Sequence, residues 1–243
     1  MLPKSWEPVP AGGMVLVGPK EDGGYVVVEK ALKPVTLLVS MGLNDDWRFE
    51  EEFHRRTGAS VICFDGSVDH RFWILHFIKS TLQLRLKRMF HYFSYRRFFS
   101  RPNIRHERKM IGHDGPGSIS LASILAEVPD KHIFLKIDIE GSEYRILDDI
   151  VRHSDRVTGI VIEFHNVDLH RERIDRFVAG LPEFAVTALH PNNWGGVDSN
   201  GDPVVLEMSL MRREYVTPPA PGEERIEMPQ NNKALPAVVA QYG

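Results

Sequence analysis

The chain has 243 residues, of which 42% are hydrophobic and 26% are charged, and its formal net charge is −3. This composition is that of a globular protein with a hydrophobic core, and the slightly acidic balance argues against nucleic acid as a partner. No stretch approaches the ~20 consecutive apolar residues that a membrane-spanning helix needs. The N-terminal "MLPKSWEPVPAGG" has no apolar segment typical of a secretory signal, and the single cysteine, Cys63, leaves no internal disulfide. We therefore expect one cytoplasmic domain over residues 1–243.

The predicted elements alternate between strands and helices. Residues 1–34 contain "MVLVGPKEDGGYVVV", which predicts a hairpin of two short strands around a glycine-rich turn. The apolar runs "VTLLVSM", "SVICFDG", "HIFLKID" and "GIVIEFH" are typical of strands buried on both faces of a sheet. Apolar residues at helical spacing predict helices after "SMGLNDD", in "SISLASILAEVP" and in "EGSEYRILDDIV". A last predicted helix ends near Gly180. This alternation predicts a parallel sheet that is covered by helices on both faces.

The last two predicted strands are of a different kind. Only the turn-rich "PNNWGGVDSNGDP" separates "FAVTALH" from "VVLEMSLMRR", so the final strand is predicted to be antiparallel. The prediction is an α/β fold with a mainly parallel seven-stranded sheet and a late antiparallel strand, the Rossmann-like arrangement of class I methyltransferases. The proline-rich tail, 217–243, is predicted to be irregular.

Polar residues gather at the predicted carboxyl ends of the strands, where open α/β sheets bind their ligands. An acid at the end of the second apolar run, Asp65, is placed to accept hydrogen bonds from both ribose hydroxyls of an adenosine cofactor, although a turn aspartate is the alternative. The loop "SMGLNDD" has one glycine and no G-x-G-x-x-G, which argues against a pyrophosphate cofactor such as NAD. The residues at these strand ends are Gly42, Asp65, Asp138, Glu163 with His165, and His190.

Two nearby carboxylates, Glu140 and Glu143, have a second interpretation. They are expected in the first turn of a helix, where the helix dipole favours negative charge by about 0.3–1 kcal/mol. Asp138 has no such explanation, because it lies at the predicted strand end itself.

Several of these stretches together resemble one family. "LKIDIEGSEYRIL", "VSMGLNDDWRFEEEF", "VICFDGS" and the late "LHPNNWGG…VVLEMSLMRR" resemble FkbM-type S-adenosylmethionine-dependent methyltransferases, and "GPKEDGGYVV" resembles the lead-in of one branch. The resemblance runs from Gly18 to Arg213 and is poor near 70–103. It implies methyl transfer from S-adenosylmethionine to a hydroxyl of a sugar, a polysaccharide or a secondary metabolite. It also implies a cofactor pocket lined by Ser40, Gly42, Glu50, Asp65, Ser120 and Asp138.

Methyl transfer to oxygen requires that the acceptor hydroxyl be aligned and lose its proton. One possibility is a general base, His165 or His190, acting beside Asp138. The other is a divalent metal, Mg²⁺ or Mn²⁺, that lowers the pKa of the hydroxyl. The alternative for Glu163 is a position under a helix, and for His165 a contact with the substrate. The predicted metal ligands are Asp138, Glu163, His165 and His190, and the predicted acceptor contacts are Glu140, Asn192, Asn193 and Trp194.

The segment 70–103 is predicted to be a basic, aromatic, helical insertion. Between Arg71 and Arg101 there are eight Lys or Arg residues, nine aromatic residues and no Asp or Glu. Such a segment could pack its aromatic side chains on the sheet or on a second copy of the chain, as in a homo-oligomer. It could also contact the inner membrane surface peripherally, or an anionic glycan.

Two other functions remain open at this point. A nicotinamide-dependent oxidoreductase is disfavoured by the missing glycine fingerprint. A non-catalytic module that binds an adenosyl ligand is disfavoured by the presence of Asp138, His165 and His190.

Overall fold

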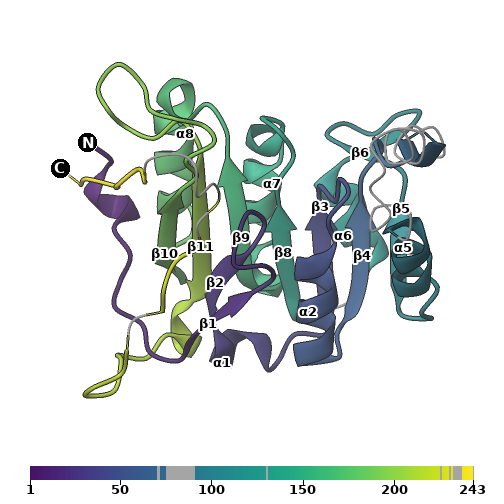
Figure 1. Cartoon of the computed structure of the whole chain (residues 1–243), viewed down its shortest axis with the longest axis horizontal. Coiled ribbons are helices and arrows are strands. Elements are labelled where there is room, and N and C mark those ends of the chain that lie inside the picture. Colours follow the sequence, from purple (N-terminus) through teal and green to yellow (C-terminus); the bar gives the residue numbers. More distant parts are fainter. Residues whose placement is uncertain are drawn as a thin grey trace.

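The structure is a computed structural model that describes residues 1–69, 72–74, 91–129, 131–224, 226–229, 231 and 237–242. Its centre is a sheet with helices on both sides (Figure 1). The strands are β1 (Met14–Val17), β2 (Tyr25–Val28), β3 (Leu37–Met41), β4 (Ser60–Phe64), β5 (Ile104–Glu107), β6 (Met110–Ile111), β7 (Ser118–Ile119), β8 (Ile133–Ile137), β9 (Val157–Phe164), β10 (Phe184–Pro191) and β11 (Leu206–Arg212). The helices are α1 (Glu29–Leu32), α2 (Arg48–Thr57), α5 (His91–Phe99), α6 (Leu121–Glu127), α7 (Leu147–Arg152) and α8 (Val167–Ala179), with 3₁₀ turns η1 (Lys4–Trp6), η2 (Glu143–Arg145), η3 (Ser154–Arg156) and η4 (Arg213–Tyr215).

The seven-stranded sheet has the order β10-β11-β9-β8-β3-β4-β5. The pairs among β5, β4, β3, β8 and β9 are parallel, and β11 runs antiparallel to both of its neighbours. This order confirms the predicted class I methyltransferase fold. The chain changes direction across the sheet between β3 and β8, so the crevice beyond their carboxyl ends is the expected ligand site.

Two hydrophobic layers explain why the strand sequences are apolar without alternation. One layer joins the sheet to α6, α7 and α8, and the other joins it to α1, α2 and the β1–β2 hairpin. Figure 1 shows the hairpin and α2 in front of the sheet and α6, α7 and α8 behind it. Because both faces are covered, successive side chains of one strand, such as Leu38 and Val39, enter opposite layers.

The N-terminal hairpin brings its turn to the carboxyl edge of the sheet. β1 and β2 pair antiparallel from Met14↔Val28 to Val17↔Tyr25, and β2 packs on β10 and β11. The amide Nδ2 of Asn192, which follows β10, donates to Asp22 Oδ1 over 3.2 Å. The turn residue Asp22 therefore lies beside the ends of β10 and β11.

Backbone hydrogen bonds fasten the tail to the N-terminal segment. Gly12 N donates to Thr217 O (2.8 Å) and Leu2 N donates to Gln241 O (2.7 Å). The described residues between 217 and 242 form neither helix nor strand.

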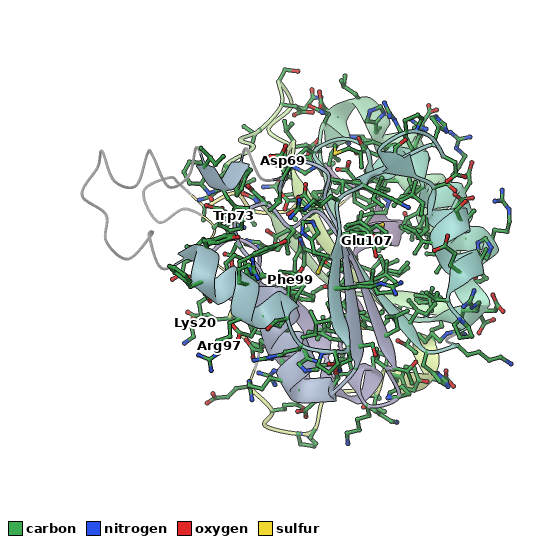
Figure 2. All side chains as sticks on the ribbon, turned by 90° about the vertical axis from the view of Figure 1, so that its right-hand side faces the viewer. Lys20, Asp69, Trp73, Arg97, Phe99 and Glu107 are labelled. Carbon is green, nitrogen blue, oxygen red and sulfur yellow. The ribbon has the colours of Figure 1, made fainter. Side chains whose placement is uncertain are left out.

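The predicted basic insertion falls largely on 70, 71 and 75–90, which lie outside the described residues. Its described part packs on the domain. Tyr95 of α5 is buried, and its ring centroid lies 4.8 Å from that of Trp73 and 5.7 Å from that of Trp47. Figure 2 shows Trp73, Arg97 and Phe99 on this side of the molecule. The described helices include none that is long and apolar enough to cross a membrane.

The end of β3 approaches the end of β8 closely at Gly42. Its φ is +85°, and a Cβ added there would lie 1.6 Å from the carbonyl oxygen of Asp138. No side chain fits between these two backbones, so a glycine is required at this position.

We expect Gly42→Ala to destabilise the fold by more than about 3 kcal/mol, because backbone strain and a clash with backbone add together. Urea unfolding measures this. The matched control is Gly58→Ala, since Gly58 also has a positive φ of +70° but nothing within 4 Å of a Cβ. The control should lose only about 1–2 kcal/mol of left-handed strain. Equal losses in the two variants would contradict the close approach.

Candidate active site

A cavity of about 540 Å³ opens at the carboxyl ends of β3, β4, β8 and β9. This volume lies in the range of small-molecule sites, about 300–1,000 Å³. The structure brings together at this cavity seven of the residues predicted from the sequence: Gly42, Glu50, Asp65, Asp138, Glu140, Glu163 and His165.

Asp65, at the end of β4, holds the loop that follows β3. Its Oδ2 accepts from the backbone N–H groups of Leu43 (2.9 Å) and Asn44 (2.8 Å). Its Oδ1 accepts from the N–H and the hydroxyl of Ser67, over 2.8 and 2.6 Å. Burial acts to raise the pKa of Asp65, but these hydrogen bonds outweigh it and lower the pKa. The predicted ribose contact would therefore share or replace the Ser67 hydroxyl.

Lys136 was not singled out in the sequence and is the buried cation beneath the cavity. Its Nζ donates to Gly42 O over 2.7 Å and lies 3.7 Å from Asp138 Oδ2. Burial acts to lower the pKa of Lys136, but the charges of Asp138, Glu50 and Glu163 raise it. A single lysine in the apolar run "HIFLKID" was the signal that could have identified it.

The predicted cofactor contacts Ser40 and Glu50 form a buried pair. Ser40 Oγ donates to Glu50 Oε1 over 2.5 Å, and both residues are fully buried. Glu50 lines the cavity, whereas Ser40 is absent from the described lining. Burial raises the pKa of Glu50, against the charge of Lys136 and the hydrogen bond from Ser40. Glu50 Oε2 has no hydrogen-bond partner among the described residues, so it can accept a hydrogen bond from a ligand.

His165 is held by Glu143. Glu143 Oε1 lies 2.6 Å from His165 Nδ1 and accepts from His165 N over 3.0 Å. Burial acts to lower the pKa of His165, but the hydrogen bond and charge of Glu143, with the charges of Glu163 and Asp138, raise it to about 9. The contact at Nδ1 leaves Nε2 facing Glu140 Oε2 at 3.5 Å and Glu163 Oε1 at 3.7 Å.

The helix-dipole interpretation of the two carboxylates after β8 is wrong for Glu140. Glu140 and Gly141 have φ values of +53° and +92° and form a turn, and only Glu143 lies in a helical turn, that of η2. Glu140 therefore lines the cavity with an exposed side chain, while Glu143 is buried against His165.

Three of the four predicted metal ligands meet. One oxygen of Asp138, one of Glu163 and one ring nitrogen of His165 lie within 4.8 Å of one another. Burial and the charges of Asp138 and Glu207 raise the pKa of Glu163. His190, the fourth predicted ligand, lies elsewhere, because its Nε2 contacts Asn231 Oδ1 at 2.6 Å. The predicted four-ligand set is therefore not assembled.

Other predicted contacts also lie outside the described lining of the cavity. Ser120 caps α6, where its Oγ accepts from Ser123 N over 3.1 Å, so the structure offers it no contact with the cavity. Asn192 and Asn193 are buried, and Trp194 is 63% exposed. Asn192 contacts the site indirectly, since its Nδ2 donates to Glu163 Oε1 over 3.0 Å.

A second polar cluster, here named the Asp22–Glu207 cluster, adjoins Glu163. Asn231 Nδ2 donates to Asp22 Oδ1 (3.0 Å) and to Glu207 Oε1 (2.7 Å). Burial raises the pKa of Tyr25 on β2, and so do the charges of four carboxylates, Asp138, Glu163, Glu207 and Asp22. Tyr25, Glu207 and Asn231 are not among the site residues predicted from the sequence. A lone glutamate in the apolar "VVLEMSLM" was the available signal.

We expect the free energy of unfolding to fall as pH rises from 6.5 to 9 in the presence of EDTA. The pKa of His165 is raised to about 9 in the folded state from 6.5, so the folded state binds more protons in this window. The raised pKa of Glu163 acts in the same direction. The loss should be on the order of 1–3 kcal/mol, measured by urea unfolding at several pH values. Glu143→Gln should weaken the dependence of the unfolding free energy on pH. A wild-type unfolding free energy that does not change with pH would contradict the raised pKa of His165.

One family model and several solved structures are similar to this chain. A family model described as the methyltransferase FkbM domain matches residues 89–185, about two-fifths of the chain. A search of curated proteins found no match. The structure is similar to those of the 23S rRNA methyltransferase ErmE (14% identity, 80% of this chain and 69% of that chain, TM-score 0.44) and of an rRNA methylase from Streptococcus thermophilus (12%, 76% and 90%, 0.41). It is also similar to precorrin-6y C5,15-methyltransferase from Geobacter metallireducens GS-15 (10%, 76% and 84%, 0.42).

Identities and TM-scores this low say nothing about the substrate. The family match includes "LKIDIEGSEYRIL", the stretch whose Asp138 and Glu140 line the cavity. The resemblance seen in the sequence is thus confirmed: residues 89–185 match the FkbM methyltransferase domain, in a chain whose sheet has the class I methyltransferase strand order.

Proposed function

We propose that this protein is an S-adenosylmethionine-dependent O-methyltransferase that acts on a hydroxyl of a sugar, a polysaccharide or another polyhydroxylated metabolite. The family match and the strand order support a methyltransferase. The observation that carries the proposal is that Gly42, Asp65, Asp138 and His165, from four different segments, line one cavity.

The loop after β3 fits a cofactor without phosphate groups. The N–H groups of Leu43 and Asn44, which could otherwise bind an anion, are both engaged by Asp65. The cavity volume of about 540 Å³ is adequate for a nucleoside with an amino-acid tail. Glu50 has a buried carboxylate oxygen without a partner among the described residues, which suits the ammonium of that tail. When bound, S-adenosylmethionine supplies the electrophilic methyl group, and Gly42, Glu50, Asp65 and Asp138 would hold it.

The charge of the cavity supports a hydroxyl-rich acceptor. Its described lining has nine carboxylates but only three Lys or Arg side chains. Ionised carboxylates only accept hydrogen bonds, so they match hydroxyl donors and repel phosphate groups. An uncharged polyol such as a sugar ring is the acceptor class that best fits this lining.

One observation favours a divalent cation over a histidine base for activating the hydroxyl. Asp138, Glu163 and His165 Nε2 provide mixed O and N donors within 4.8 Å of one another, a set that suits Mg²⁺ or Mn²⁺. A cation held there would lower the pKa of the acceptor hydroxyl. Glu143 would orient the ring, as carboxylates behind metal-binding histidines do.

The test is release of S-adenosylhomocysteine with a panel of sugars and glycosides. We expect His165→Gln to lower turnover about 10²–10⁴-fold, because the group that positions the hydroxyl or its cation is lost. Its dissociation constant for S-adenosylmethionine, measured by calorimetry, should change less than about threefold. His54→Gln is the control, since the described lining of the cavity does not include His54, whose Nδ1 contacts Ala59 O at the C-terminal end of α2.

The arms of this test separate the parts of the proposal. EDTA should abolish turnover and added Mn²⁺ or Mg²⁺ should restore it. Turnover that is insensitive to EDTA would remove the cation and leave the methyl transfer. Calorimetry that detects NAD but not S-adenosylmethionine would overturn the proposed function as a whole.

A further inference from the structure

Three segments far apart in the chain bring carboxylates together in the Asp22–Glu207 cluster. Asp22 comes from the β1–β2 turn, Glu163 from β9 and Glu207 from β11. One oxygen of each lies within 4.8 Å of the other two. The proposed cation position uses Asp138, Glu163 and His165, so it leaves Asp22 and Glu207 without a role.

The arrangement places two buried carboxylates face to face, where a cation would hold both in their ionised form. Glu163 and Glu207 lie directly opposite each other on neighbouring antiparallel strands, and they are only 6% and 4% exposed. Like charges in directly opposite positions destabilise a sheet, and burial increases their repulsion.

An independent observation also indicates a ligand at this place. The hydroxyl of Tyr25, a residue only 2% exposed, is buried and has no hydrogen-bond partner among the described residues. Tyr25 lies on β2, which packs on β10 and β11, and the charges of Asp138, Glu163, Glu207 and Asp22 act on its hydroxyl. A buried hydroxyl is rarely left without a partner beside carboxylates, unless a ligand or a water completes the site.

The amides in the cluster hold the carboxylates in place. Asn192 Nδ2 donates to Asp22 Oδ1 and to Glu163 Oε1, and Asn231 Nδ2 donates to Asp22 Oδ1 and to Glu207 Oε1. Each amide thus bridges two carboxylates and fixes their separation. This is the role of groups that orient the ligands of a metal.

We propose that Asp22, Glu163 and Glu207 form a second site for a hard divalent cation, Mg²⁺, Mn²⁺ or Ca²⁺, next to the position at Asp138, Glu163 and His165. Carboxylate oxygens are the donors that these ions prefer. Glu163 belongs to both groups and bridges them. Carboxylate-bridged ions in two-metal sites are about 3.5–4 Å apart. The second site does not depend on the proposed function, because it concerns binding to the protein alone.

Titration of the metal-free protein with Mn²⁺, followed by the electron paramagnetic resonance of free Mn²⁺, tests the proposal. We expect two bound ions per chain in the wild type and one in Asp22→Asn. Asp22 is exposed on a turn, so this variant should fold normally. The matched control is Glu21→Gln, on the same turn, which should still bind two ions. Glu207→Gln should behave like Asp22→Asn if circular dichroism shows that it folds.

His165→Gln separates the two positions. The proposal predicts that this variant retains the ion that Asp22→Asn loses. One bound ion in the wild type, lost in Asp22→Asn and retained in His165→Gln, would support the second site and remove the first. One bound ion that is retained in Asp22→Asn and lost in His165→Gln would overturn the proposal. The same holds if the wild type binds no ion, or if Asp22→Asn leaves the stoichiometry unchanged.

Discussion

The site depends on the interactions of one buried cation, the ammonium group of Lys136. It binds the carbonyl of Gly42 at the end of β3 and lies close to Asp138 at the end of β8. Taking carboxylates out of water costs several kcal/mol for each ion unless an opposite charge is near. Lys136 provides that charge for Glu50 and Glu163 as well. Lys136 therefore connects the loop after β3 with the carboxylates at the ends of β8 and β9.

The other carboxylates of the site form hydrogen bonds with neutral or cationic side chains. Glu143 fixes the ring of His165, and the amides of Asn192 and Asn231 bridge Asp22, Glu163 and Glu207. These groups come from the N-terminal hairpin, from the strands and from the tail. A polar centre built from such distant segments requires most of the chain to be folded, which couples the site to the stability of the whole domain. It also concentrates negative charge at one edge of the sheet, where a positively charged cofactor and cations would be attracted.

Much of the fold could be predicted because its signals are local. Apolar runs such as "HIFLKID" and "GIVIEFH" have strand length and end in ionisable residues, so their carboxyl ends and the residues Asp138 and His165 were identified directly. The antiparallel direction of the last strand could be predicted because the sequence between β10 and β11 has no helical pattern. Ser120 shows the limit of this approach: its predicted role was implied by resemblance, whereas its contacts are those of a helix cap. His190 also lies at a strand end, but β11 separates β10 from β9, and its ring contacts the tail.

The amino-acid sequence by itself determined the alternation of strands and helices, the covering of both sheet faces and the acidic strand ends, because hydrophobic periodicity and turn residues act over a few positions. Only the tertiary structure decided which polar groups share a space. The packing of the hairpin on β10 and β11 placed Asp22 near Glu207, and the turn after β8 placed Glu143 beneath His165. Such contacts join residues separated by 22 to 209 positions. A local sequence pattern carries no information on which distant segments pack together.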